Sequence, residues 1–338
     1  MDVLVIGGTG LISTGIVRQL IGEGHDVTAV HRGETDADLP GSVDHLIADR
    51  TEYAAFESRM ADLAPDCVID MVCFDPADAE SAIRAFEGRT DQFVFCSTES
   101  VYSRPADSLP IDEDGPRSPP TDYGTKKARC EDLFMEAHRE EAFETTILRP
   151  WSTYGEGGTI LHTLGSDTAY IDRIRRGKPI VVHGDGSGLW GPCHRDDVAR
   201  AFVNAVGNER AYGEDYLVTS EEVMTWEVYH RKVADALDAP EPDLVSIPTD
   251  VLIEAAPERT DLLEDFLQYS TLFDNSKAER DLDFEYTIDW ERGVERTVTH
   301  LDEHDRIDDA EADPFYDRLI EAWRGSREEF LESFDGGS

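Results

Sequence analysis

The sequence has few basic residues and no run of apolar residues long enough to cross a membrane. Of its 338 residues, 31 are Lys or Arg and 73 are Asp or Glu, so the formal net charge is −42 at pH 7. This charge repels nucleic acid, whose binding depends on cationic contacts to phosphates. Only five of the cations are lysine, and the acidic residues are spread along the chain. The pattern favours a protein adapted to a high-salt cytoplasm, with no nucleic acid as partner.

Cysteine is also scarce, and its spacing excludes two classes of site. The five cysteines are odd in number and include no Cys-x-x-Cys pair, which argues against a disulfide framework and against a metal site. They are predicted to be buried free thiols in a reducing compartment. No apolar run approaches 18 residues, and no secretory signal precedes the first apolar run. We therefore expect a cytoplasmic protein without a membrane partner.

The first half of the chain alternates short apolar runs with helical patterns. This alternation predicts a doubly wound parallel sheet covered by helices on both faces, an α/β fold of the Rossmann type. The expected strands are Val3–Ile6, Val27–Val30, Asp44–Ile47, Cys67–Met71, Phe93–Cys96 and Thr145–Leu148. The expected helices are Thr14–Glu23, Glu52–Leu63, Ala77–Phe86 and Asp122–Arg139.

The pattern is looser after Pro150. We expect a helix at Asp196–Val206 that returns to the first domain. The predicted division is a domain over 1–160, completed by about 186–208, and a smaller mixed α/β part over 161–185 and 209–338. Its expected elements are a strand at Pro179–Val182 and helices at Tyr170–Arg176, Val223–Leu237, Asp250–Ala255, Asn275–Leu282, Trp290–His304 and Phe315–Phe334.

A glycine-rich turn lies where the first strand meets the first helix, in the run Gly7-Gly-Thr-Gly-Leu-Ile-Ser13. Gly7 permits a tight turn, and Gly10 lets the backbone approach a pyrophosphate at the helix N-terminus. Leu11 and Ile12 complete the predicted contact. A dinucleotide fingerprint would have a third glycine at Ser13, but serine is small enough for close packing of helix on strand.

The end of the second strand carries His31 and Arg32 in place of an acidic residue. An Asp or Glu there would hold the ribose 2′-hydroxyl of NAD. A guanidinium suits a 2′-phosphate through bidentate hydrogen bonds. The sequence therefore favours NADP over NAD mildly, while an Arg that lies in solvent over the adenine remains the alternative.

Tyr123 and Lys127 form a Tyr-x-x-x-Lys pair inside the helix expected at Asp122–Arg139. Side chains four residues apart lie on one face of a helix. A neighbouring ammonium favours the phenolate, so Lys127 is predicted to lower the pKa of Tyr123 and make it usable for proton transfer near neutral pH. A strand that ends in hydroxyl-bearing residues, Phe93 to Tyr102, precedes this pair.

In their order, the glycine turn, the hydroxyl-ended strand and the Tyr-x-x-x-Lys pair resemble the extended short-chain dehydrogenase/reductase family. That family includes nucleotide-sugar epimerases and dehydratases, and the resemblance extends to about Val206. It implies a catalytic triad of Thr98, Tyr123 and Lys127. Tyr123 would be the acid/base, Lys127 would hold the nicotinamide ribose, and Thr98 would hydrogen-bond the reacting substrate oxygen.

The resemblance also implies further contacts to the cofactor and a homodimer. Asp49 matches an acid that contacts adenine, Met71 lies where the cofactor channel would be lined, and Pro150 faces the nicotinamide. Tyr154, in the segment Leu148 to Gly155, is a candidate for contact with substrate.

Two residues depart from the pattern of the family and narrow the substrate. Sugar 4,6-dehydratases carry an acid and a base after the strand, whereas here Glu99 has no second carboxylate beside it, which disfavours elimination of water. Glu99 remains a candidate for substrate contact. Trp190 stands where nucleotide-sugar enzymes have an Arg on the pyrophosphate. It could stack on a sugar, or it could be a buried aromatic residue of the core.

The leading hypothesis is an NAD(P)-dependent oxidoreductase or epimerase that acts on a carbinol carbon of a small sugar-like molecule. A nucleotide-sugar 4-epimerase or dehydratase is the first alternative. A cofactor-binding regulatory or RNA-binding module is an alternative of another class, disfavoured by the net charge of −42.

Overall fold

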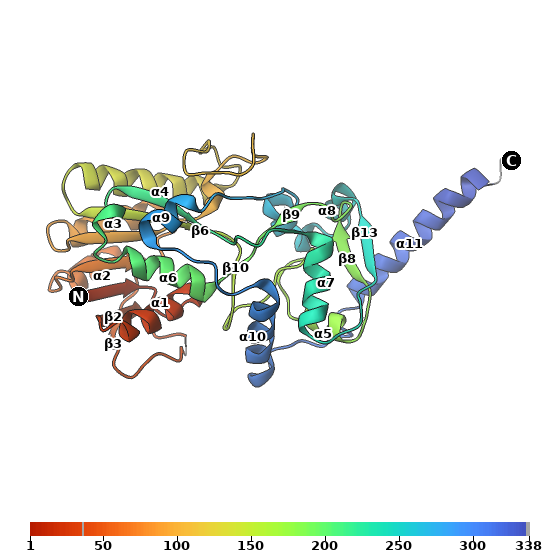
Figure 1. Cartoon of the computed structure of the whole chain (residues 1–338), viewed down its shortest axis with the longest axis horizontal. Coiled ribbons are helices and arrows are strands. Elements are labelled where there is room, and N and C mark those ends of the chain that lie inside the picture. Colours follow the sequence, from red (N-terminus) through yellow and green to blue (C-terminus); the bar gives the residue numbers. More distant parts are fainter. Residues whose placement is uncertain (36, 336–338) are drawn as a thin grey trace. The chain divides into compact units, whose positions relative to one another are not determined.

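The computed structural model describes residues 1–35 and 37–335, and the chain divides into two compact units. The first unit consists of 1–155, 191–223 and 271–289, and the second of 156–190, 224–270 and 290–338. The N-terminal half of the chain, from red to yellow-green in Figure 1, contributes six of the seven strands of the sheet of the first unit. The chain therefore crosses between the units several times.

The first unit is built on a parallel sheet of seven strands, in the order β11-β6-β5-β4-β1-β2-β3. Its strands are β1 (Asp2–Ile6), β2 (Asp26–His31), β3 (Asp44–Ile47), β4 (Cys67–Asp70), β5 (Gln92–Cys96), β6 (Glu144–Pro150) and β11 (Glu214–Val218). Six of these confirm the predicted strands. The direction of winding changes between β1 and β4, and ligands of open α/β sheets bind at the carboxyl ends of strands at such a point.

Helices cover both faces of the sheet because each inner strand is apolar on both sides (Figure 1). Val3 and Val5 contribute to one core, and Leu4 and Ile6 to the other, since side chains alternate along a strand. The first core is covered by α1 (Leu11–Gly22), α6 (Arg195–Ala205) and α9 (Ser276–Leu282). The second is covered by α2 (Tyr53–Met60), α3 (Pro76–Phe86) and α4 (Asp122–Arg139).

The division into units differs from the predicted one in four places. The first unit ends at 155 rather than 160 and resumes at 191 rather than at about 186. Residues 209–223 and 271–289, expected in the substrate part, belong to the first unit. The reason is strand pairing, because β11 hydrogen-bonds to β6 along the whole of its length and extends the sheet. Helix α9 then packs against β11 and α6. A short ladder of β7 (Thr153–Tyr154) and β10 (Cys193–His194) also lies in this unit.

The second unit has two small sheets and an aromatic core. In one sheet β8 (Ile180–His183) pairs in parallel with β13 (Leu244–Ile247), and in the other β9 (Leu189–Trp190) pairs antiparallel with β12 (Met224–Thr225). Its helices are α5 (Ala169–Arg175), α7 (Trp226–Ala236), α8 (Thr249–Ala255), α10 (Trp290–Glu303) and α11 (Pro314–Asp335). Stacked or tilted rings of Trp190, Trp226, Tyr229 and Trp290 fill its interior.

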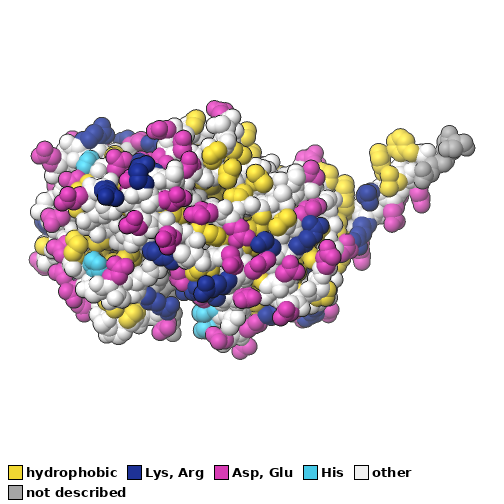
Figure 2. Space-filling view, in the orientation of Figure 1, with side chains coloured by type: hydrophobic (Ala, Val, Ile, Leu, Met, Phe, Trp, Pro, Cys, Tyr) yellow, Lys and Arg dark blue, Asp and Glu magenta, His cyan; other side chains and the backbone are white. Residues whose placement is uncertain are grey.

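The distribution of carboxylates on the surface and the burial of the cysteines agree with what the composition predicts. Carboxylates are scattered over the whole visible face rather than gathered in one patch (Figure 2). All five cysteines are buried free thiols, as predicted. Within the described residues, no helix combines the length and the apolar character that a bilayer span requires.

Candidate active site

The glycine turn has the geometry that the sequence predicts, and Ser13 holds it together. Gly7 has a φ of +79°, and a Cβ built on it would lie 2.5 Å from Val72 Cγ1, so a side chain there is excluded. Gly10 is the N-cap of α1. The Ser13 hydroxyl donates to the Gly7 carbonyl at 2.6 Å and accepts from the Gly10 N–H at 2.8 Å. Serine in the third glycine position therefore braces the turn.

A cavity of about 360 Å³ opens beside this turn, at the carboxyl ends of β1 to β4. Its lining includes Gly7, Gly10, His31, Arg32, Asp49, Arg50, Val72, Phe74 and Asp78. The free N–H groups at the start of a helix and the helix dipole favour a phosphate there. The turn and the cavity together fit the pyrophosphate and adenosine of a dinucleotide.

The predicted cofactor residues at the ends of β2 and β3 have partners of their own. The Arg32 guanidinium is exposed and lies 2.9 Å from a Glu34 carboxylate oxygen. The His31 ring contacts His45 at 2.9 Å, and burial together with His45 lowers the pKa of His31. Asp49 accepts hydrogen bonds from the hydroxyl and N–H of the residue two positions on, and these bonds lower its pKa. All three side chains line the cavity as expected.

The sequence interpretation missed a buried ion pair in the wall of this cavity. Arg50 Nη1 donates to Asp70 Oδ2 at 2.5 Å, and Arg50 Nη2 donates to the Asp78 carbonyl at 2.8 Å. Arg50 is 6% exposed and Asp70 is fully buried. The available signal was an acidic residue that ends the apolar run of β4, since such a charge needs a partner when buried.

Helix α4 begins where its capping residues predict. The Thr121 side chain accepts from the Gly124 N–H at 3.0 Å, and Asp122 lies in the first turn, where a negative charge complements the helix dipole. The bounds of the helix, Asp122–Arg139, are those predicted. Tyr123 and Lys127 therefore lie one turn apart on the same face.

The structure brings Tyr123 and Thr98 together, and it buries Lys127 beside them. The Thr98 side chain lies near the Tyr123 phenol and lowers its pKa. The Lys127 ammonium, 2% exposed, donates to the carbonyl oxygens of Cys96 at 2.6 Å and of Cys73 at 3.0 Å. These contacts hold the three predicted triad residues in one place at the end of β5.

The predicted effect of Lys127 on the pKa of Tyr123 is wrong for this structure. Although Tyr123 is 42% exposed, partial desolvation of its phenol raises the pKa of Tyr123 to about 12, while the neighbouring Thr98 lowers it only partly. The physical reason is the direction of the Lys127 ammonium, whose N–H groups are directed at two backbone carbonyls. Tyr123 is consequently protonated at neutral pH, which suits a proton donor.

Besides lying near Tyr123, Thr98 stabilises the backbone turn that follows it. Its side chain caps a short 3₁₀ turn, Glu99–Val101, by accepting from the Ser100 N–H at 3.2 Å.

The prediction that Glu99 contacts substrate does not agree with the structure. Glu99 is fully buried, accepts from the Ser100 hydroxyl at 3.0 Å and forms an ion pair with Arg104. A buried carboxylate needs a cationic partner, and the sequence pattern did not show which basic residue would form the ion pair with Glu99.

Trp190 also differs from its predicted role. The ring is 1% exposed, and its centroid lies 5.0 Å from that of Trp226 in the core of the second unit. It offers no face for a sugar to stack on, because β9 pairs with β12 and directs the side chain inward. The alternative interpretation, a buried aromatic residue, agrees with the structure.

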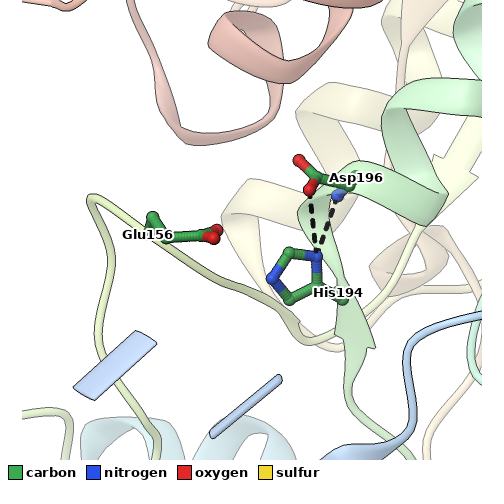
Figure 3. A group of neighbouring side chains, drawn as sticks. All are labelled: Glu156, His194 and Asp196. Atoms are coloured by element: carbon green, nitrogen blue, oxygen red, sulfur yellow. Dashed lines mark hydrogen bonds and ion pairs between the residues drawn. The ribbon is translucent and has the colours of Figure 1, made fainter. Parts of the chain in front are cut away.

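The remaining predicted residues line the interior of the first unit. Pro150 ends β6, and Met71 follows β4 and packs against the core beneath α1. Tyr154 is buried, with its ring 5.4 Å from that of His194 in a T-shaped contact. His194 in turn caps α6 by accepting from the Asp196 N–H at 3.2 Å (Figure 3).

The chain was compared with known proteins. Residues 3–219 match the model of the NAD dependent epimerase/dehydratase family. The 2′-dehydrokanamycin reductase of Streptomyces kanamyceticus is 30% identical over 280 residues, which cover 83% of this chain and 78% of that protein. The chloroplast stem-loop binding protein of 41 kDa b of Arabidopsis thaliana is 28% identical over 256 residues, 72% of this chain and 65% of that protein.

Solved structures show the same fold at lower identity. UDP-glucuronic acid 4-epimerase from Bacillus cereus, in complex with NAD, has a TM-score of 0.71 at 19% identity and covers 90% of this chain and 97% of its own. UDP-glucose 4-epimerase from Thermotoga maritima, with UDP-glucose, has a TM-score of 0.72 at 20% identity, with coverage of 90% and 99%.

Proposed function

The chain belongs to the NAD dependent epimerase/dehydratase family, and we propose that it is an NAD(P)-dependent carbonyl reductase or epimerase of a sugar-like substrate. The observation that carries this proposal is the proximity of the Tyr123 and Thr98 side chains beside the buried ammonium of Lys127. The glycine turn and the neighbouring cavity of about 360 Å³ support a dinucleotide cofactor.

Each residue of the triad has a role that its contacts allow. Tyr123, with a pKa of about 12, is a neutral phenol that donates its proton to the carbonyl oxygen of the substrate. Thr98 orients that oxygen from the other side. Lys127 donates two of its N–H groups to backbone carbonyls, and its third N–H group would donate to a ribose hydroxyl of the cofactor. The nicotinamide ring, when bound, supplies or accepts the hydride.

A neutral Tyr123 phenol can donate the proton that reduction of a carbonyl requires. During reduction the C=O bond gains a hydride on carbon and the Tyr123 proton on oxygen, which yields a carbinol. Oxidation reverses these steps and uses the phenolate as base. The similarity to a reductase with 30% identity supports the direction of reduction.

The substrate is proposed to lack a nucleotide diphosphate. A desolvated diphosphate needs cations. The basic residues that could replace the missing Arg all form ion pairs with carboxylates; they are Arg173, Arg175, Arg176 and Lys178. Trp190 replaces the Arg of nucleotide-sugar enzymes and is buried. The solved neighbours with UDP-sugars argue the other way, so the question calls for direct measurement.

Titration calorimetry tests the substrate class. Cofactor-loaded protein is titrated with UDP-glucose and UDP-galactose, and we expect no binding in the micromolar range. A parallel screen follows oxidation of NADPH or NADH by absorbance in the presence of uncharged and amino-substituted keto-sugars. Micromolar binding of either UDP-sugar would return the protein to the nucleotide-sugar 4-epimerases.

The cofactor released on denaturing the purified protein separates reductase from epimerase. A tightly held NAD is expected of an epimerase, because the hydride returns to the same substrate molecule. An empty site is expected of a reductase, which exchanges its cofactor in each cycle.

An RNA-binding function is the second candidate, on the similarity to a chloroplast stem-loop binding protein. The net charge of −42 opposes it, since phosphate binding requires clustered cations. A gel-shift with stem-loop RNA in molar salt decides between them, and we expect no shifted band.

A further inference from the structure

Three successive turns of α4 face the segment that ends β5, and two of them form hydrogen bonds with it. Tyr123, Lys127 and Glu131 are spaced by four residues, so they lie on one face of the helix. Lys127 donates to the Cys96 carbonyl and Glu131 accepts from the Ser97 hydroxyl, while Tyr123 lies near the next residue, Thr98. The helix that carries the proton donor is therefore fastened to the residues that face it.

Glu131 is the centre of a buried network. Its carboxylate, 1% exposed, accepts from Ser97 Oγ at 2.5 Å and from Arg149 Nε and Nη2, each at 2.8 Å. The Arg117 guanidinium approaches it at 3.0 Å. Each oxygen thus has two donors, and the fork of Arg149 matches the carboxylate in a bidentate arrangement.

Arg149 extends the network to two further strands. It belongs to β6 and is 2% exposed. Its Nη1 donates to the Tyr102 hydroxyl at 2.7 Å and also pairs with Asp215 of β11. The guanidinium therefore links α4, β6 and β11 to the turn that follows β5.

We propose that Glu131 and Arg149 are positioning residues that set the separation between Tyr123 and Thr98. A buried ion pair adds little stability over apolar residues of the same size, but it fixes geometry through directional bonds. Ser97 transmits that geometry, because it lies between the Lys127 acceptor at Cys96 and the Thr98 hydroxyl. The kinetic side of this proposal rests on the function proposed above.

Ser97→Ala is the sharpest test, because it removes one hydrogen bond and leaves the ion pair intact. We expect kcat to fall by about 10- to 100-fold, since small displacements of reacting groups cost rates of this order. KM for the cofactor should stay unchanged. In protein with ¹³Cζ-labelled tyrosine, assigned with Tyr123→Phe, the Tyr123 resonance should move because the position of the phenol relative to Thr98 changes. Ser97→Thr keeps the hydroxyl and should restore both readouts.

Asp197→Asn is the matched control for the loss of a buried carboxylate. Asp197 is fully buried in α6 and accepts from Thr287, Ile288 and Arg200 at 2.6–2.9 Å, as Glu131 does from its own partners. Glu131→Gln and Asp197→Asn should both lower the melting temperature. Only Glu131→Gln should move the Tyr123 resonance and reduce kcat.

Two results would overturn the proposal. One is a Ser97→Ala protein with unchanged kcat and an unmoved Tyr123 resonance. The other is an equal change of both readouts in Asp197→Asn, which would mean that the network acts only through stability. If the wild-type protein reduces no sugar, the proposed function fails but the resonance still decides the positioning role.

Discussion

Tyr123 combines a phenol protonated at neutral pH with a hydroxyl partner, and these are the parts of a proton donor. Tyr123→Phe should reduce turnover by roughly two to four decades, the range of general acid–base catalysis. The ring stays in place, so the dissociation constant of the cofactor and the melting temperature should hardly change. Steady-state kinetics and fluorescence titration measure the two effects. Retention of most of the activity would remove Tyr123 from the mechanism.

Arg32 bears on the choice between NADP and NAD. Arg32→Asp should shift the ratio of dissociation constants toward NAD, because it removes a phosphate partner and adds an acceptor for a ribose hydroxyl. The Arg32–Glu34 contact is exposed and competes only weakly with a phosphate. Arg18→Asp is the control, since Arg18 pairs with Asp38 on the surface and makes the same change of charge. An equal ratio in both variants would place Arg32 in solvent.

Two buried histidines of the second unit predict loss of stability in weak acid. Burial lowers the pKa of His183 to about 4 and that of His230 to about 3, from an ordinary value of 6.5. The unfolded chain therefore binds more protons than the folded chain below pH 6.5, so stability is full above that pH and is lost as the pH falls toward 4. Thermal melts in molar salt from pH 8 to pH 4.5 test this. A constant melting temperature would contradict it.

At the scale of the element, Gly124 sets how closely α4 approaches the 3₁₀ turn after Thr98. A Cβ on Gly124 would lie 2.2 Å from the Ser100 carbonyl oxygen and 2.7 Å from Pro119 Cβ. Gly124→Ala should therefore push the helix away from the turn, which lowers both the melting temperature and kcat.

Gly325→Ala, inside α11, is the counterpart of that change. Among the described residues, no atom outside the adjoining helix backbone lies within 4 Å of a Cβ built there, so alanine should stabilise the helix by roughly 0.5–1 kcal/mol. Calorimetric melts of the two variants should move in opposite directions. A Gly124→Ala protein as active and as stable as the wild type would show that α4 can shift without cost.

Across the whole molecule the dominant property is the charge of −42. Self-repulsion destabilises the compact state, and salt screens it, because the Debye length falls from about 30 Å at 0.01 M to about 3 Å at 1 M. The melting temperature should therefore rise steeply with potassium chloride. An uncharged osmolyte at matched osmolality is the control and should raise it much less. A flat salt profile would count against adaptation to high salt.

The local features of the fold could be read from the sequence alone. Six strands of the sheet, the helix at Asp122–Arg139 and the glycine turn follow from apolar periodicity, capping residues and turn chemistry. These signals operate over a few residues, so neighbours in the chain are sufficient to show them. The same holds for Tyr123 and Lys127, whose spacing places them on one face whatever the helix packs against.

Only the tertiary structure decided which distant residues became partners. Strand β11 extends the sheet by pairing with β6, although no pattern in its five residues predicts β6 as its neighbour. Glu99 forms an ion pair with Arg104 and is not available to a substrate. The Lys127 ammonium donates to backbone carbonyls, and desolvation raises the pKa of Tyr123. Desolvation depends on everything that packs around a group, and that environment is assembled from segments far apart in the chain.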